Sequence, residues 1–391
     1  MRIAQVCPFF LPVEGGVESH VLNISKELLR RGNEVHVFTC SMTRDSEKLP
    51  STSDIDSIYV HRYPPIVVLG EFGSLWPGFM IDVISGDFDV IHAHSFRHPH
   101  TDLSAIAAKL SHSRSVLTSH SPFHPPGVRS PLARGLVPVY DHLLAPMVLK
   151  NFDRVVSLTA NEAQALAALG APRENLTVIP NGVEDVHFES IPIDGFLSKF
   201  SLTGSRVILY LGRVNRTKGL DVLLKAFALA SPSLNGVRLV VAGPASSKEE
   251  IAYLSSLRLL AQKLGISSKV TFTGRLSEEE KLEALQCCTV FVLPSVYEPF
   301  GIVILEAAAH AKAIVSTRTD GPASIIEDGS DGILVTPGDS IELGKRLSEL
   351  LNDDDLLKKL SEAARHTAER YRWRKVVDTL VHVYSDSGIA A

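Results

Sequence analysis

The strongest constraint on the fold is a regular alternation of short β-rich runs with helical stretches, repeated in both halves of the chain. This alternation is typical of parallel sheets covered by helices. In the first half, the runs expected to form strands are Ile3–Cys7, Glu34–Thr39, Asp89–Ala93, Ser115–Ser119, Val155–Leu158 and Leu176–Ile179. In the second half, they are Val207–Leu211, Arg238–Ala242, Val270–Phe272, Val290–Leu293, Ala313–Ser316 and Gly332–Val335. The pattern predicts an α/β protein with two doubly wound domains.

The helices are expected between these runs. The clearest candidates are Val17–Arg31 with Gly32 as its stop, Gly219–Leu229, Lys248–Leu264, Glu278–Gln286, Ile302–Ala311 and Trp373–Tyr384. Residues 59–69 hold further strand-like residues. Glycine favours the end of a helix because it adopts the left-handed conformation without steric cost.

The 391 residues suggest two domains of ordinary size. We expect the first domain at residues 1–185 and the second at 186–370, with the linker in the aperiodic segment 180–204. Residues 371–391 form a C-terminal helix that we expect to cross back onto the first domain. Because doubly wound sheets bind ligands at the carboxyl ends of their strands, two facing domains predict a site in the cleft between them.

Composition narrows the class of partner and the compartment. The net charge of -5 argues against nucleic acid as a partner, because a phosphate backbone requires a basic surface. The four cysteines contain no C-x-x-C motif and are expected to be buried thiols of a reducing compartment. A strand at Arg2 leaves no room for a signal peptide, and residues 64–84 are too interrupted to span a membrane. We therefore expect a cytoplasmic protein.

Two glutamates eight positions apart are the first candidate site. Glu298 precedes Gly301 in a tight loop after a buried strand, and Glu306 lies in the apolar helix that follows. The start of a helix attracts phosphate through its unpaired N–H groups, and Gly301 lets the backbone approach a ligand closely. One carboxylate can hold the hydroxyls of a sugar and the other those of a ribose. The alternative is a solvated helix face, which explains an acid within an apolar helix poorly.

Two cations form the second candidate site. Arg213 follows the first strand of the second half, and Lys218 stands five residues later at a helix start. Such a pair can clamp a diphosphate, although an ordinary surface loop has the same composition. Gly274, at the end of another strand, is a candidate for a backbone contact to a base ring.

Gly15 and Gly16 follow the first strand and open the first helix. They can bring backbone N–H groups to an anion, but a turn that requires positive φ at glycine explains them as well. Neither G-x-G-x-x-G nor G-x-x-x-x-G-K-[ST] occurs in the chain.

Histidines are concentrated in the first half. They include His92, His94, His98, His100, His120 and His124. Imidazole is a common zinc ligand, but no matching carboxylate or thiol arrangement completes a recognisable set. We therefore expect no metal, and interpret these residues as the polar lining of the acceptor side, with His120 in contact with substrate.

Together these residues resemble the retaining, nucleotide-sugar-dependent glycosyltransferases of the GT-B fold, a family that includes glycogen and sucrose synthases and phosphatidylinositol mannosyltransferases. The resemblance covers essentially the whole chain. Its markers are Gly15-Gly16, His92-Ala-His94, His120, Asn181-Gly182, Gly212-Arg213, Lys218-Gly219 and the Glu298–Glu306 pair. It implies two Rossmann-like domains facing across a cleft.

The resemblance also implies residue roles. Arg213 and Lys218 would neutralise the donor diphosphate, so that no metal or other cofactor is required. Glu306 would hold the ribose, Glu298 the transferred sugar, and His120 would contact that sugar. The remaining donor contacts would come from backbone groups of Gly16, Phe300, Gly301 and Ile302. The residues do not distinguish UDP-, GDP- and ADP-linked sugars.

The implied reaction moves a sugar to an acceptor hydroxyl with retention of anomeric configuration. No nucleophile for a double displacement is evident, which favours transfer on one face with help from the donor phosphate. Two alternatives use the same fold: a nucleotide-sugar epimerase, and a non-catalytic nucleotide-sugar-binding protein. The missing dinucleotide fingerprint disfavours a dehydrogenase.

The acceptor is expected to be a glycan or a lipid. The opening Gly16-Val-Glu-Ser-His20 resembles that of enzymes which glycosylate membrane lipids. Residues 123–150 combine apolar side chains with Arg129, Arg134 and Lys150, which can meet an anionic inner membrane face peripherally. A plain loop and a cleft-lining helix explain this segment equally well.

Overall fold

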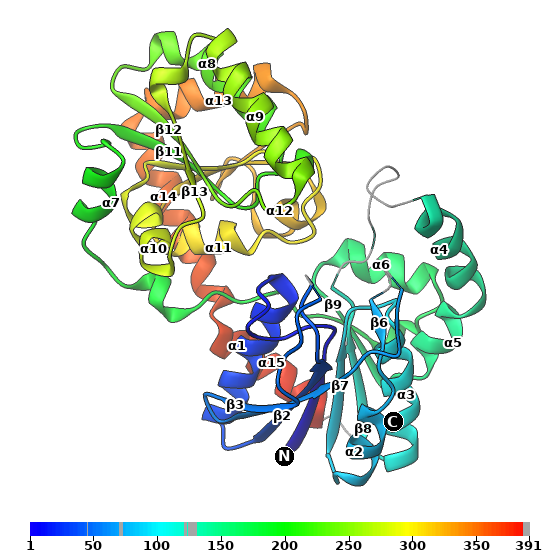
Figure 1. Cartoon of the computed structure of the whole chain (residues 1–391). Helices are drawn as coiled ribbons and strands as arrows, with labels where there is room; N and C mark the ends of the chain where they lie inside the picture. The colour runs from blue at the N-terminus through cyan, green and yellow to red at the C-terminus, as the bar shows by residue number, and fades with distance from the viewer. Residues whose placement is uncertain (45, 70–72, 121–122, 124–130, 386–391) are drawn as a thin grey trace. The chain divides into compact units, whose positions relative to one another are not determined.

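The computed structural model describes residues 1–44, 46–69, 73–120, 123 and 131–385. The chain, drawn in Figure 1, divides into two compact units. Unit 1 consists of residues 1–182 and 373–391, and unit 2 of residues 183–372. The boundaries predicted from the sequence, at residues 185 and 370, lie close to these changes of unit.

Unit 1 is built on an eight-stranded sheet in the order β10-β9-β8-β7-β1-β2-β4-β3. All neighbours pair in parallel except β3, which pairs antiparallel with β4 at one edge. The strands are β1 (Arg2–Val6), β2 (Glu34–Cys40), β3 (Thr52–Ile55), β4 (Ile58–Tyr63), β7 (Val90–His94), β8 (Arg114–Thr118), β9 (Arg154–Ser157) and β10 (Leu176–Val178). A separate antiparallel pair joins β5 (Val67–Val68) to β6 (Ser74–Leu75).

The helices of unit 1 cover both faces of this sheet. They are α1 (Gly16–Arg30), α2 (Phe79–Ser85), α3 (Pro99–Ser111), α4 (Pro131–Leu143), α5 (Ala145–Lys150), α6 (Ala160–Ala168), η2 (Arg173–Asn175) and α15 (Trp373–Ser385). One face packs Ile3 and Val90 against α1 and α15, whereas the other packs Ala4 and Ile91 against α2 and α3. Since successive strand residues point to opposite faces, strands that are buried along their length require helices on both sides.

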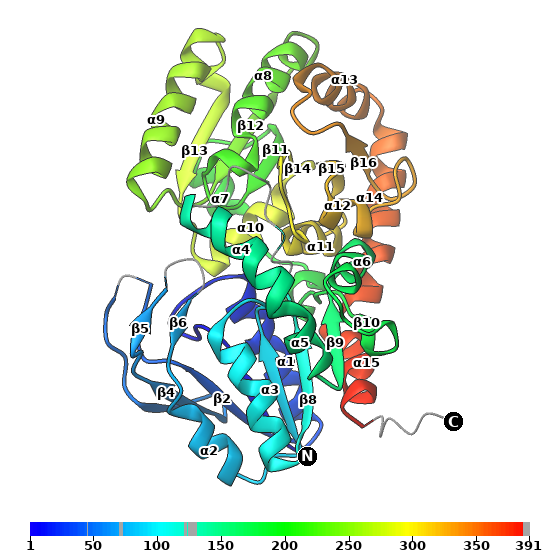
Figure 2. The same cartoon turned by 90° about the vertical axis from the view of Figure 1, so that its right-hand side faces the viewer.

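The C-terminal helix α15 belongs to unit 1, where it lies beside α1 (Figures 1 and 2). Its buried residues Trp373, Val377 and Leu380 join the same core as Val21 and Leu28 of α1. The two ends of the chain thus complete one hydrophobic core.

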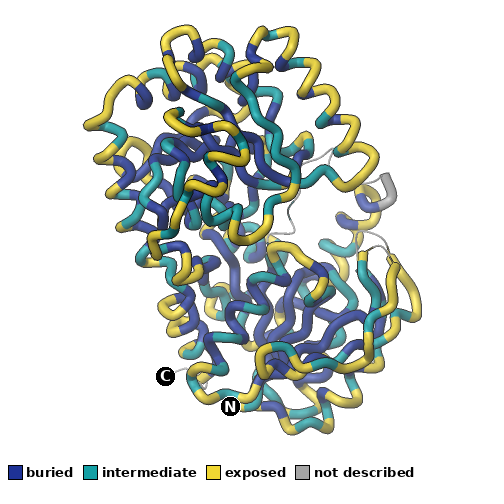
Figure 3. The backbone as a smooth tube through the Cα atoms, turned by 60° about the vertical axis from the view of Figure 1, so that its left-hand side comes forward, coloured by how far each residue is buried: buried dark blue, intermediate teal, exposed yellow. Residues whose placement is uncertain are grey.

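Unit 2 is built on a six-stranded, all-parallel sheet in the order β13-β12-β11-β14-β15-β16. Its strands are β11 (Arg206–Leu211), β12 (Val237–Ala242), β13 (Val270–Gly274), β14 (Val290–Leu293), β15 (Ala313–Thr317) and β16 (Ile333–Val335). Its helices are η3 (Asp185–Phe188), α7 (Asp194–Lys199), η4 (Arg216–Lys218), α8 (Leu220–Ala230), η5 (Ser231–Ser233), α9 (Lys248–Lys263), η6 (Ser267–Lys269), α10 (Glu278–Cys287), α11 (Ile302–Ala309), α12 (Asp320–Ile325), α13 (Ser340–Leu351), α14 (Asp354–Ala368) and η7 (Glu369–Tyr371). Figure 3 colours each residue by burial, and the buried residues of each unit lie in its interior.

Local sequence explains where several of these helices begin and end. Ser247 and Ser277 start α9 and α10 through capping boxes with the glutamate three residues further on. The helix predicted at Ile302–Ala311 ends earlier, at Ala309, because Ala311 takes the left-handed conformation with φ 54°. The edge strand β3 was not predicted, since its alternation of exposed and half-buried residues lacks an apolar face.

Each sheet has one point at which its strand order reverses. In unit 1 the order runs outward from β1 toward β2 and from β7 toward β8, and in unit 2 it runs outward from β11 and from β14. Ligands of doubly wound sheets bind at the carboxyl ends of the strands beside such a reversal. Among the described residues, no helix is both long and apolar enough to cross a membrane.

Candidate functional site

The predicted cations and carboxylates of unit 2 follow the two strands at its reversal point. Arg213 and Lys218 come after β11, and Glu298 comes after β14, which pairs with β11 in parallel. Their loops therefore emerge side by side at the carboxyl edge of the sheet. The sequence predicted each loop, but not that the two strands are neighbours.

Gly219 explains how closely these two loops approach. Its φ of 63° is left-handed, and a Cβ there would stand 2.2 Å from the carbonyl oxygen of Pro294. The N–H of Val296 donates to the carbonyl of Thr217 over 2.8 Å, which ties the loops together through the backbone. Only glycine tolerates both this contact and this conformation.

Within the joined loops, Lys218 and Glu298 form an ion pair. Lys218 Nζ donates to Glu298 Oε2 over 2.6 Å, and the hydroxyl of Ser295 donates to the same oxygen over 3.3 Å. The two side chains are 19% and 10% exposed. A mostly buried pair of opposite charges is a charged, preorganised site rather than a solvated surface.

Arg213 lies at the same edge but is exposed, and it forms no ion pair with any residue that the structure describes. The hydroxyl of Tyr210 donates to the Arg213 carbonyl over 2.8 Å, which holds the turn after β11 in place. The guanidinium of Arg213 therefore remains available to a ligand.

Glu306 contacts a different cation from the one that Glu298 contacts. It lies one turn into α11, where Lys281 Nζ of α10 donates to its Oε1 over 2.9 Å and His187 Nε2 stands 3.8 Å away. Burial raises the pKa of the Glu306 carboxyl, but Lys281, His187 and His310 together outweigh burial, and the net pKa is lowered. Glu306 is thus held as a carboxylate that can only accept hydrogen bonds. Neither Lys281 nor His187 was predicted, because both are distant in sequence.

The turn at Phe300, Gly301 and Ile302 begins α11. Gly301 is its N-cap with φ 91°, and the backbone of the buried Phe300 packs against Gly321 so closely that a Cβ on Gly321 would lie 2.4 Å away. The first N–H groups of a helix have no partner within it, so they can bind an anion or a hydroxyl.

Gly274 lies at the same carboxyl edge, two strands from β11. It has φ 74°, and its carbonyl accepts the N–H of Gly243 over 2.9 Å. Gly243 in turn leaves no room for a Cβ, which would stand 1.9 Å from the Gly212 carbonyl. Gly212, Gly243 and Gly274 thus form a row of side-chain-free backbone across three strands.

Gly16 lies in unit 1, as the first residue of α1 after β1. A positive φ does not explain the two glycines, because Gly15 is extended with φ 172°. A Cβ on Gly16 would have no atom within 4 Å, so the helix start is open to a ligand.

His120 lies after β8, also in unit 1, with a left-handed φ of 56°. Such strain in a residue other than glycine is concentrated at functional sites. Its Nε2 lies 3.1 Å from His94 Nδ1. His94 ends β7, one of the two strands at the reversal point of this sheet.

A buried polar network supports these histidines. His92 Nδ1 lies 2.7 Å from the Tyr384 hydroxyl and its Nε2 lies 2.7 Å from Thr118 Oγ1, while Gln5 Nε2 donates to the same Tyr384 hydroxyl over 3.2 Å. Burial lowers the pKa of His92, His94 and His120 well below the ordinary value, so all three imidazoles are neutral. Gln5 and Tyr384 were not predicted from the sequence. Asn181 was a marker of the family resemblance, but its buried contact with His20 was not predicted.

His124 and Arg129 lie outside the described residues. All four cysteines are free thiols, as predicted. Cys7, Cys40 and Cys288 are buried as expected, whereas Cys287 is only partly buried.

Comparison with known proteins identifies the family of the chain. The family described as "Glycosyl transferases group 1" matches residues 198–367, and "Glycosyltransferase Family 4" matches residues 14–186. A D-inositol 3-phosphate glycosyltransferase of Mycolicibacterium smegmatis is 30% identical over 95% of this chain and 86% of its own length. A phosphatidyl-myo-inositol mannosyltransferase of Mycobacterium leprae is 28% identical over 98% of this chain and 96% of its own length.

Solved structures have the same fold. Anabaena HepE in complex with UDP and glucose superposes with a TM-score of 0.77 at 21% identity, covering 99% of this chain and all of its own. Sucrose-phosphate synthase from Thermosynechococcus elongatus gives 0.77 at 20% identity over 98% of each chain. The protein is a glycosyltransferase with two Rossmann-like domains of the GT-B type, and it belongs to the group 1 glycosyltransferases.

Proposed function

We propose that this enzyme transfers a sugar from a nucleotide-sugar donor to an acceptor hydroxyl with retention of anomeric configuration. The observation that carries the proposal is the Lys218–Glu298 pair, 2.6 Å apart at the reversal point of the unit 2 sheet. This is where a doubly wound sheet binds its ligand.

In this proposal, Arg213 and Lys218 bind the donor diphosphate and stabilise the charge that develops on it as the glycosidic bond breaks. Fixed cations at a developing negative charge are the largest contribution to many such reactions. The exposed guanidinium of Arg213 and the partly buried ammonium of Lys218 suit this role. The two cations would stabilise the charge on the diphosphate without a metal.

The two glutamates bind separate parts of the donor. Glu306, kept ionised by Lys281, accepts hydrogen bonds from the ribose hydroxyls, and Glu298 accepts them from the transferred sugar. The backbone N–H groups of Phe300, Gly301 and Ile302 contact the sugar and phosphate, and the open turn at Gly274 suits a base ring. The UDP and glucose bound to Anabaena HepE support a donor of this class.

Gly16 would bind the diphosphate and His120 would contact the sugar, as the family resemblance implies. Glu298 is engaged by Lys218 and so is a poor nucleophile, which favours transfer on one face of the sugar. The leaving phosphate would take the proton of the acceptor hydroxyl. Nuclear magnetic resonance of the product measures its anomeric configuration, and an inverted product would contradict retention.

We propose that the acceptor carries an inositol phosphate. The M. smegmatis relative is named for D-inositol 3-phosphate and the M. leprae relative for phosphatidyl-myo-inositol, so the two share this group. A lipid form is supported by α4, α5 and the residue that joins them, which expose a run of large apolar residues: Leu136, Val139, Leu143, Leu144 and Met147. The exposed Arg134 and Lys150 accompany them.

A thermal-shift screen with UDP-, GDP- and ADP-sugars tests the donor. The cognate donor should raise the unfolding temperature, because a ligand that binds only the native state stabilises it. Arg213→Ala and Lys218→Ala should each abolish the rise, whereas Lys225→Ala, a half-exposed lysine of α8, should preserve it. Unchanged shifts in both variants would refute the diphosphate clamp.

Product analysis separates the remaining alternatives. With the cognate donor and inositol phosphate, a glycosylated acceptor supports the transferase, whereas epimerised donor without acceptor favours an epimerase. Stabilisation by donor with no turnover on any acceptor favours a binding protein. Flotation with phosphatidylinositol vesicles distinguishes a lipid acceptor, which requires co-flotation of the enzyme, from free inositol phosphate.

A further inference from the structure

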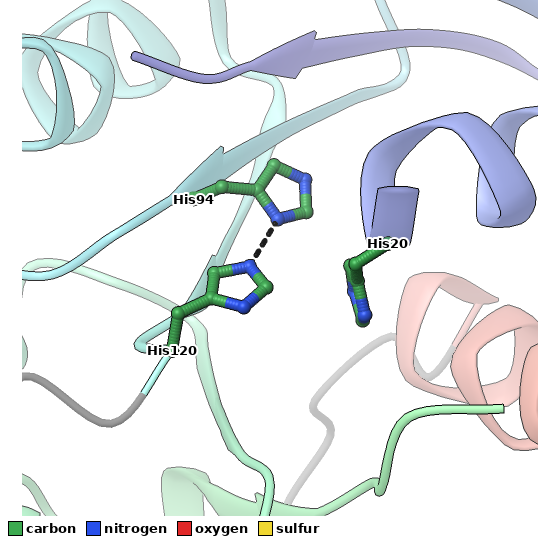
Figure 4. A group of neighbouring side chains, drawn as sticks. All are labelled: His20, His94 and His120. Carbon is green, nitrogen blue, oxygen red and sulfur yellow. Dashed lines mark hydrogen bonds between the residues drawn. The ribbon is translucent and has the colours of Figure 1, made fainter. Parts of the chain in front are cut away.

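Three histidines of unit 1 converge although they come from distant parts of the chain. His20 lies on α1, His94 ends β7, and His120 follows β8 (Figure 4). Each offers one ring nitrogen, and these nitrogens all lie within 4.8 Å of one another. His20 and His94 are buried, at 3% and 0% exposure. His94 and His120 were weighed from the sequence as zinc ligands, but His20 was not, because it lies on a helix rather than at a strand end.

Hydrogen bonds on the outer side of this cluster determine where the protons sit. His20 Nδ1 lies 2.7 Å from Asn181 Oδ1, and His94 Nε2 lies 2.7 Å from Gln5 Oε1. Amide oxygens only accept, so both of these ring nitrogens carry the proton. The opposite nitrogens, His20 Nε2 and His94 Nδ1, therefore present bare lone pairs toward the centre of the cluster.

One of these lone pairs has no partner. His20 Nε2 is buried and makes no hydrogen bond with the residues that the structure describes. A buried polar atom without a partner is costly, and each such atom requires an explanation. The lone pair of His94 Nδ1 faces His120 Nε2 at 3.1 Å. The arrangement therefore contains more inward-facing acceptors than donors, which is what a bound cation requires.

The spacing of the rings suits a tetrahedral ion. Three imidazoles that bind one Zn²⁺ through bonds of about 2.0 Å have ring centres roughly 5 Å apart. The observed separations are 4.8 Å for His20–His120, 5.3 Å for His94–His120 and 5.6 Å for His20–His94. Small side-chain rotations about this arrangement would bring all three nitrogens to one ion.

We propose that His20, His94 and His120 bind one divalent transition-metal ion, with Zn²⁺ as the best fit. Neutral imidazole is the ligand form, and burial favours that form in all three residues. Asn181 and Gln5 orient the ligands in the way that outer partners of metal-bound histidines do. His92 is excluded as a ligand, because Tyr384 and Thr118 occupy both of its nitrogens.

The absence of carboxylate ligands among these residues selects the kind of ion. Mg²⁺ and Ca²⁺ prefer oxygen ligands, whereas three imidazoles suit Zn²⁺, Ni²⁺ or Cu²⁺. Three protein ligands leave a fourth position open to water or a ligand oxygen. The inference concerns metal binding only. It assigns the imidazole of His120 to the ion, whereas the proposed transferase function assigns His120 to the sugar, so metal titration and activity test the two separately.

Binding is measured on the full-length protein by titrating Zn²⁺ against a chromophoric chelator. One ion per chain is expected. His20→Ala should weaken the affinity by more than about 100-fold, and Asn181→Ala by about 10–100-fold, the usual effect of losing an outer partner. All four thiols remain in every variant, so differences between variants report on the imidazoles.

His61→Ala is the matched control. His61 and His36 also face each other, with 2.9 Å between ring nitrogens, but without a third imidazole. This variant should bind as the unsubstituted protein does. Equal affinity of the unsubstituted protein and His20→Ala, or an equal loss in His61→Ala, would overturn the proposal.

Co²⁺ provides a second measurement that requires no variant. Bound by these imidazoles, it should show the intense visible absorption of a tetrahedral ion, and Zn²⁺ should displace it stoichiometrically. Weak octahedral absorption, or no displacement by Zn²⁺, would contradict the site even if His20→Ala fails to fold.

Discussion

A Cβ on Gly219 would stand 2.2 Å from the carbonyl oxygen of Pro294. This relationship joins the loop after β11 to the loop after β14, and it places Lys218 beside Glu298. The cationic and acidic parts of the candidate donor site thus depend on the absence of one side chain.

Gly219→Ala should therefore lower the unfolding temperature and abolish stabilisation by the donor. The left-handed conformation alone costs about 1–2 kcal/mol for a residue with a Cβ, and the contact with Pro294 adds to it. Gly236→Ala is the matched control, because Gly236 has φ 68° but no atom within 4 Å of its Cβ position. Equal losses of thermal stability in the two variants would contradict the close contact.

Lys218→Met should destabilise the protein because it leaves the carboxylate of Glu298 unpaired, with its side chain only 10% exposed. We expect a loss of roughly 2–4 kcal/mol, a little below the usual range for a fully buried pair. The double variant Lys218→Met/Glu298→Gln should recover part of it. Thermal unfolding of the single and double variants measures the coupling, and strictly additive effects would show that the two charges do not interact.

Asp102 should make stability depend on pH. Burial raises its pKa from 3.8 to about 6, although the Tyr140 hydroxyl that donates to it over 2.7 Å acts in the opposite direction. Between these values the folded state binds a proton that the unfolded state lacks, so stability falls as pH rises through this window.

Asp102→Asn should match the unsubstituted protein near pH 4 and exceed it at pH 7 by roughly 1–3 kcal/mol. Tyr140→Phe removes the hydroxyl that donates to Asp102, so the loss of stability with rising pH should become larger. Unfolding curves across pH 4–7 provide the measurement. A difference between Asp102→Asn and the unsubstituted protein that is independent of pH would disprove the raised pKa.

Tyr384→Phe should destabilise unit 1 by about 1–3 kcal/mol, because the hydroxyl joins Gln5 to His92 inside the core. The control is Tyr59→Phe, a tyrosine of β4 that is 48% exposed and should be replaced at little cost. Both variants are compared by thermal unfolding. A loss in Tyr384→Phe no larger than in the control would mean that the network contributes nothing.

The local features of the fold could be predicted because their causes are local. Apolar runs of strand length, glycines after helices and serine capping boxes act over a few residues, and they place most strands and helices close to their observed bounds. The same applies to the loops that carry Arg213, Lys218 and Glu298, since each follows a recognisable strand. The near-complete burial of Glu298 and Glu306 likewise agrees with their apolar sequence surroundings.

Only the tertiary structure decided which distant segments of the chain lie in contact. Strand order makes β11 and β14 neighbours, Lys281 reaches Glu306, and α15 returns to unit 1 with Tyr384. His20 joins His94 and His120 for the same reason. No periodicity along the chain encodes these pairs, because they depend on which strands pair and which helix face packs on the sheet. Sequence by itself therefore determined the elements and their loops, whereas long-range packing decided which side chains share a site.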